Sequence, residues 1–193
     1  MPKKRDLSRT GRLTITAACL SLCVLLPYAF HALPNAATVF SPMHIPVLLC
    51  ALACGWGYGL LCGAAGPVLC FLVTGMPNAA ELLPMIGECA VYGLVAGVCM
   101  RYIRTGKFYP DCYLSLIAAM LAGRIVGGLL QALVFSAGNY SFALWATTYF
   151  LRGWPAIVIQ LVLLPNVLFT LTKVGLLKEK YPKQSPSQEY EEE

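Results

Sequence analysis

Apolar residues follow one another along this chain in long runs, separated by short breaks that are polar or rich in glycine and proline. The stretch from Ile45 to Gly75 contains no charged side chain and turns at Gly55-Trp-Gly-Tyr-Gly59. Long uncharged apolar runs are typical of helices embedded in lipid, and clustered glycines mark the turns between them. The pattern therefore predicts a membrane hairpin of two helices, with His44 at its polar lip.

Four more apolar runs flank this hairpin, one before it and three after it. Together with the hairpin they predict an all-α, integral-membrane bundle of six helices, in which Pro27 kinks the outer part of the first. The four runs cover about 13–33, 80–104, 112–137 and 144–172.

The two ends of the chain are polar. The opening segment 1–12 is basic, and the closing segment 175–193 is rich in Lys, Gln, Pro and Glu, a composition typical of disorder. We therefore expect a basic N-terminus over 1–12, a six-transmembrane-helix domain over 13–174 and a disordered tail over 175–193.

Lysine and arginine are distributed unevenly between the connecting segments. Five precede the first helix, three (Arg101, Arg104 and Lys107) follow the fourth helix, and four lie in the C-terminal segment. The other connections hold none apart from Arg152 at an edge. Because basic residues stay on the cytoplasmic side of membrane proteins, and six helices return the chain to its starting side, we expect both termini in the cytoplasm.

The composition supports a membrane protein. The chain of 193 residues is 58% hydrophobic and only 12% charged, whereas soluble domains average about 25% charged. The net charge of +5 comes from residues at the ends of segments, without the mixture of aromatic and basic residues that nucleic-acid binding favours. Nine cysteines lie mostly inside apolar runs, where they act as small hydrophobic residues rather than a disulfide framework.

Three charged residues fall within or near the expected bilayer: Glu88, Arg124 and Arg152. A charge at mid-membrane costs at least about 2.5–3.5 kcal/mol and normally faces a partner or a polar cavity. We expect Glu88 and Arg124 to meet as an ion pair, which either clips two helices together or lines a cavity. Tyr92 and Gln131 lie one and two turns away on the same faces.

Other chemistry is not indicated. His31 and His44 lie near the outer surface, and the cysteine pairs lie deeper, so no metal site is expected. No Ser-His-Asp set, carboxylate pair or phosphate-binding loop appears, and we expect neither an enzyme nor an ATPase. Arg152 either extends to the lipid headgroups or pairs with an anionic ligand.

From about Leu13 to Val174 the chain resembles the substrate-binding S components of energy-coupling factor (ECF) vitamin transporters. The resemblance rests on the six-helix layout and on five segments in the family's order. These are His44-Ile-Pro-Val-Leu-Leu, Gly75-Met-Pro77, Pro84-Met-Ile-Gly-Glu-Cys-Ala-Val-Tyr-Gly93, Gly123-Arg-Ile-Val-Gly127 and Trp154-Pro-Ala-Ile-Val-Ile-Gln-Leu-Val-Leu-Leu-Pro165.

The resemblance implies a multi-pass protein of the bacterial cell membrane that binds a vitamin-like molecule with high affinity, without cofactor or ATPase activity. Similar proteins dock on a transmembrane coupling subunit that carries two ATPase subunits. Docking in the family uses an Ala-xxx-Ala pattern on the first helix, which here reads Ala17-xxx-Ser21. Carried over residue by residue, the substrate site comprises His44, Met76, Glu88, Tyr92, Arg124, Gln131, Asn139, Trp145, Trp154 and Gln160.

The sequence does not identify the substrate. Two arginines favour a compound with a carboxylate or phosphate, and His-Ile-Pro-Val resembles the pantothenate subgroup, which makes pantothenate one candidate. The alternative function is a stand-alone secondary transporter or channel for a small polar solute, with Glu88 and Arg124 along its path. Polarity gathers in the last three helices, which favours a pocket over a pore.

Overall fold

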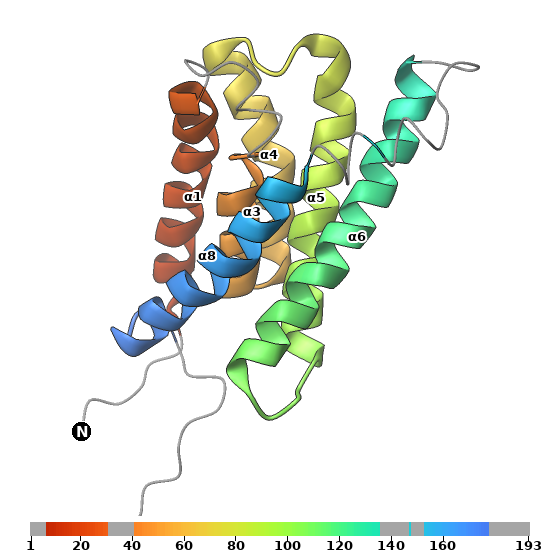
Figure 1. Cartoon of the computed structure of the whole chain (residues 1–193). Helices are drawn as coiled ribbons and strands as arrows, with labels where there is room; N and C mark the ends of the chain where they lie inside the picture. The colour runs from red at the N-terminus through yellow and green to blue at the C-terminus, as the bar shows by residue number, and fades with distance from the viewer. Residues whose placement is uncertain (1–6, 31–40, 136–146, 148–152, 178–193) are drawn as a thin grey trace, which may run out of the picture.

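The computed structural model describes residues 7–30, 41–135, 147 and 153–177. Within them the regular structure is helical, as expected, and six helices form a bundle (Figure 1). Five of the six are long and apolar enough to cross a membrane. Their bounds are α1 Arg9–Phe30, α3 His44–Cys54, α4 Trp56–Thr74, α5 Ala79–Tyr102, α6 Phe108–Phe135 and α8 Trp154–Lys173.

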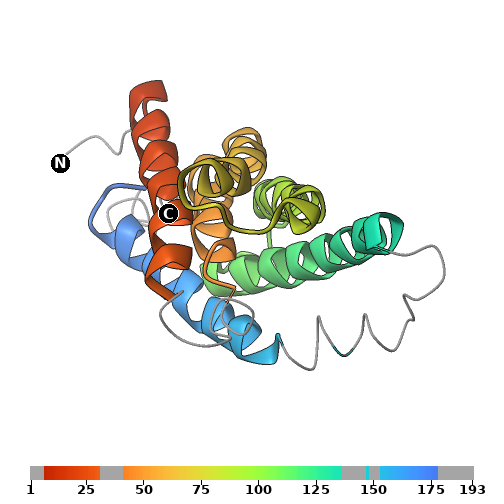
Figure 2. The same ribbon diagram turned by 90° about the horizontal axis from the view of Figure 1, so that it is seen from above.

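The short helix α3 forms the centre of the bundle. It packs against α1, α4, α5 and α8 (Figure 2). Most of its residues are buried, and a helix that is apolar on all sides suits such a protein interior as well as it suits lipid. Its 11 residues extend about 16 Å at the usual rise, well short of a bilayer core of about 30 Å. The first half of the expected hairpin is thus a buried half-length helix.

The connections follow the turn chemistry of the sequence. Gly55, with φ of 97°, separates α3 from α4 in a conformation that favours glycine. Gly75 ends α4 in the left-handed region, and the Asn78 side chain caps α5 by accepting a hydrogen bond from the Glu81 N–H at 3.1 Å. Helix α6 begins one turn earlier than expected because Pro110 is tolerated in the first turn, where its missing N–H has no intrahelical partner.

Glycines bring α4 and α5 into backbone contact. A Cβ atom at Gly63 would overlap the backbone of Cys89, one at Gly93 that of Gly59, and one at Gly97 that of Trp56. In lipid, such small residues allow the close approach of helices that drives their association. We call this line of contacts the glycine seam; it joins residues 56–63 of α4 to residues 89–97 of α5.

The buried cysteines cluster beside the seam. Cys23, Cys50 and Cys62 are fully buried, and Cys50 Sγ donates to Thr16 Oγ1 at 3.5 Å. All nine cysteines are free thiols. They fill the contacts of α1 and α3 with their neighbours as small apolar side chains.

Candidate functional site

A cavity of about 490 Å³ lies at the end of the bundle where α3 and α5 begin. We call it the upper cavity. Its size falls in the range of small-molecule sites, about 300–1,000 Å³. Seven of the expected site residues line it: His44, Met76, Glu88, Tyr92, Arg124, Gln131 and Gln160.

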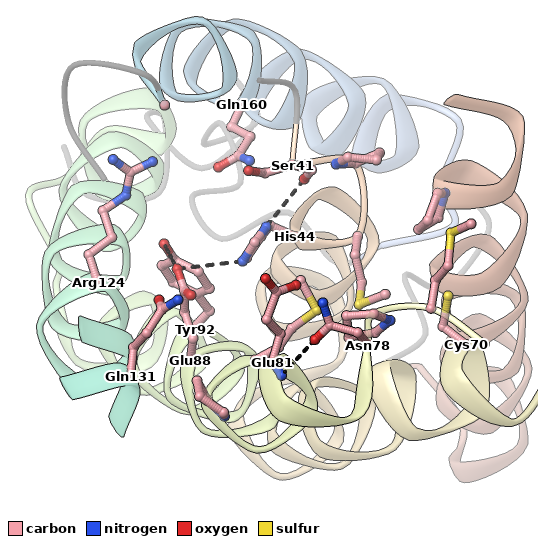
Figure 3. Close-up of a pocket in the computed structure, with 18 residues that line it drawn as sticks. Ser41, His44, Cys70, Asn78, Glu81, Glu88, Tyr92, Arg124, Gln131 and Gln160 are labelled. Atoms are coloured by element: carbon pink, nitrogen blue, oxygen red, sulfur yellow. Dashed lines mark hydrogen bonds and ion pairs between the residues drawn. The ribbon is translucent and has the colours of Figure 1, made fainter. Parts of the chain in front are cut away.

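Three of these residues form a polar cluster on the cavity wall (Figure 3). Tyr92 Oη donates to Glu88 Oε1 at 3.0 Å, and His44 Nε2 lies 3.6 Å from the same oxygen. The His44 and Tyr92 rings meet edge to face with centroids 4.9 Å apart. All three side chains are buried. The carboxylate is therefore held by groups of α3 and α5.

The small residues of α6 make this arrangement possible. A Cβ atom at Gly123 would lie 2.7 Å from the Tyr92 ring, and one at Gly127 would lie 2.8 Å from Glu88 Oε2. A larger residue at either position would push the cluster out of place. The repeated glycines of the expected fifth helix thus form a packing surface that faces the cavity.

The two ring nitrogens of His44 face two acceptors. Nδ1 lies 3.3 Å from the backbone carbonyl oxygen of Ser41, and Nε2 lies 3.6 Å from Glu88 Oε1. The ring therefore bridges the start of its own helix and the carboxylate of α5.

The structure corrects the expected ion pair between Glu88 and Arg124. Both side chains line the upper cavity and both are buried, Glu88 at 8% and Arg124 at 6% exposure. Among the described residues, however, the ion pair of Glu88 is with His44. In Figure 3 the Arg124 guanidinium lies apart from the carboxylate, on the side of the cavity bounded by α8, from which Gln160 enters. The clip between two helices is thus replaced by two separate charged groups on one cavity.

The remaining expected site residues differ in their outcome. The Trp154 side chain is 60% exposed and does not line the upper cavity. The adjoining residue Gly153 lines the cavity in its place. Asn139, Trp145 and Arg152 lie outside the described residues.

Sequence reasoning missed a polar rim formed by Ser41, Asn78 and Glu81. Asn78 and Glu81 have the spacing of a helix N-cap, three residues apart, and this signal could have placed the start of α5 at the mouth of the cavity. Across the described part of the chain, no three His, Cys, Asp or Glu side chains are grouped as a metal site would require.

The expected docking residues lie on the outside of α1. Ala17 and Ser21 are exposed, whereas Thr16, Cys19 and Cys23 point into the bundle. Ser21 Oγ donates to the Ala17 carbonyl oxygen at 3.1 Å, so the hydroxyl is satisfied within its own helix. The serine therefore leaves a small, smooth surface at the position where the family pattern has alanine.

Comparison with known proteins gives one finding. A family described as "ECF transporter, substrate-specific component" has a sequence model that matches residues 11–174. No curated protein and no solved structure matches the chain.

Proposed function

The chain belongs to the family of ECF transporter substrate-specific components, which makes it a multi-pass cell-membrane protein and a substrate-binding subunit, and we propose that its substrate is a small anionic micronutrient held in the upper cavity. The single observation that carries this proposal is the buried set of His44, Glu88, Tyr92 and Arg124 around 490 Å³ of space. Buried charges of this kind are kept where they bind something.

The charge balance supports an anionic substrate. Glu88 lies 3.6 Å from His44 Nε2, and Glu81 lies at the polar rim, whereas the guanidinium of Arg124 brings a permanent positive charge to the buried wall of the cavity. A guanidinium pairs well with the planar carboxylate or the phosphate of a ligand. Gln131 and Gln160 add amide groups that bind hydroxyl or amide functions. Pantothenate, which carries one carboxylate, remains a candidate.

The orientation follows from the basic residues. Arg12, Arg101 and Arg104 lie at the end of the bundle opposite the upper cavity. By the positive-inside rule that end faces the cytoplasm, together with both termini, and the upper cavity opens outward. In this arrangement the substrate-binding domain spans 13–174, with five membrane-crossing helices around the buried half-length helix α3, and 1–12 and 175–193 are cytoplasmic segments.

Transport then depends on partners. Membership in the family implies an ECF module, and the sequence itself contains no phosphate-binding loop for ATP. The exposed small residues Ala17 and Ser21 offer α1 as a close-packing surface for the coupling subunit. Substrate release would be driven by the two ATPase subunits of that module.

Uptake into proteoliposomes tests this function. The chain alone is expected to bind substrate without transporting it, and addition of an ECF module with ATP is expected to start accumulation. Ala17→Leu with Ser21→Leu should keep substrate binding and lose uptake, whereas Ser21→Ala, which stays small, should keep both. Flux through the chain alone would instead support a channel or secondary transporter.

A further inference from the structure

A second cavity, of about 850 Å³, opens at the other end of the bundle. We call it the lower cavity. It lies where α3 ends, α4 begins and α5 ends, and the 55–58 turn forms part of its wall. None of the residues that line it lines the upper cavity, so the substrate site does not account for it.

Three arginines converge on the lower cavity from two helices and a following loop. Arg12 comes from α1, Arg101 from the last turn of α5, and Arg104 from the loop after it. No acidic residue is among the described residues that line the cavity, and none of the three arginines forms an ion pair within the described part of the chain. A cavity whose charged lining residues, among those described, are all cations favours an anion as its occupant.

The backbone adds donors to the same wall. The first N–H groups of a helix have no intrahelical acceptor, and α4 begins at Trp56 without a side-chain cap. Trp56, Gly57 and Tyr58, which carry these groups, all line the cavity. Guanidinium groups and helix N-terminal N–H groups are the donors that bind phosphate oxygens.

Exposed aromatic side chains indicate the depth of the cavity in the membrane. Trp56 is 45% exposed, and Tyr102 is 74% exposed with the Arg101 guanidinium 6.0 Å from its ring centroid. Tryptophan and tyrosine are enriched where the apolar core of a bilayer meets the headgroups. This places the arginines at the level of lipid phosphates.

We propose that the lower cavity binds the phosphate of an anionic phospholipid. The phosphodiester sits between Arg101, Arg104 and the first turn of α4, and the acyl chains run along the exposed surface of the bundle. Basic pockets between membrane helices are known to take such headgroups. The inference does not depend on what the upper cavity binds.

Lipid titration followed by native mass spectrometry tests the proposal on the full chain. Phosphatidylglycerol is added to the protein in detergent, with phosphatidylcholine as the zwitterionic probe. One phosphatidylglycerol is expected to be retained, and phosphatidylcholine is not. The variant Arg101→Gln with Arg104→Gln is compared with Arg9→Gln with Lys107→Gln, which removes the same charge from positions that do not line the cavity. We expect the first variant to bind phosphatidylglycerol at least about tenfold more weakly than the second.

Two further arms distinguish the source of the phosphate and the class of partner. Inorganic phosphate and glycerol phosphate are titrated in nanodiscs made of phosphatidylcholine, where no binding is expected. Equal phosphatidylglycerol binding by the two double variants would overturn the proposal. Binding of soluble phosphate as tight as that of the lipid would overturn it as well, and so would an arginine-dependent complex with an acidic partner protein that forms in place of lipid binding.

Discussion

The two cavities use the same side chain, arginine, in opposite ways. In the upper cavity Arg124 is buried and shares the wall with a carboxylate, a histidine and two amides. In the lower cavity the arginines have no carboxylate beside them among the described residues, and Arg101 and Arg104 are exposed. Burying an uncompensated charge costs several kcal/mol, whereas water at the membrane surface hydrates it. Depth therefore decides which charges must be balanced.

The glycine seam links the two cavities. Helices α4 and α5 run from one to the other, with Gly63, Gly93 and Gly97 in backbone contact between them. The seam holds the two helices together from Trp56 and Gly97 at the lower cavity up to Cys89, the residue next to Glu88 of the upper cavity. Substitutions in the seam should affect both cavities, and substitutions inside one cavity should leave the other intact.

Gly93→Ala should have the largest effect, because it breaks both cavities together. The new Cβ atom would overlap backbone atoms of Gly59, which no side-chain rotation can relieve. We expect a destabilisation of about 3 kcal/mol, a thermal midpoint about 10 °C lower in detergent, and loss of both ligands. Gly11→Ala is the matched control, because its Cβ atom would meet side-chain ends of Leu7 and Ser8 rather than backbone atoms. Equal midpoints for the two variants would contradict the seam.

Arg124→Ala should remove substrate binding and spare the lower cavity. Loss of a buried cation that pairs with the anionic group of the ligand is expected to weaken binding by about 100-fold. Calorimetric titration measures this, with pantothenate as the first compound to try. The affinity of Arg124→Lys should fall between those of the unaltered protein and Arg124→Ala, because lysine keeps the charge but lacks the planar guanidinium group. Unchanged binding by Arg124→Ala would remove this residue from the site.

Glu88→Gln should have a smaller effect on an anionic substrate. The amide keeps the shape of the side chain and still accepts from Tyr92, while His44 loses its carboxylate partner. Because Arg124 keeps its charge, we expect the affinity for an anionic substrate to change by less than about tenfold. A loss of affinity as large as that of Arg124→Ala would indicate that Glu88 contacts the substrate itself. That contact would be expected of a cationic substrate.

Trp154→Ala should have the smallest effect. Its side chain is exposed and does not line the upper cavity. We expect substrate affinity to change by less than about twofold, measured by the same titration. A loss of tenfold or more would restore the stacking role that the sequence suggested for this tryptophan.

The helical architecture could be predicted because uncharged apolar runs determine it directly. The limits of the helices were found to within a few residues, except at the hairpin and at the start of the last helix. That helix was expected from about 144, whereas α8 begins at Trp154 and all of 144–152 but residue 147 lies outside the described residues. At the hairpin the apolar run from Ile45 looks the same whether lipid or protein surrounds it, since both environments favour the same residues. The short length of α3 follows from the break at Gly55. This glycine is visible in the sequence, but the segment before it was not compared with the thickness of a bilayer.

Most residues of the site could be predicted from the sequence, but their contacts with one another could not. A charged side chain inside the bilayer costs free energy, and this indicated Glu88 and Arg124 as functional candidates. Seven of the expected site residues line one cavity. Their pairing depended on the side-chain directions of α3, which a sequence read helix by helix does not give. His44 was treated as a lip residue, whereas the fold buries it beside the Glu88 carboxylate.

The most direct test of the central claim is native mass spectrometry of the protein purified from membranes of its own host. The account predicts one small molecule per chain, with a carboxylate or phosphate group, which is absent from Arg124→Ala and retained by the Arg101→Gln and Arg104→Gln double variant. A bound molecule retained by Arg124→Ala and lost from the double variant would contradict it, because the substrate would then belong to the lower cavity.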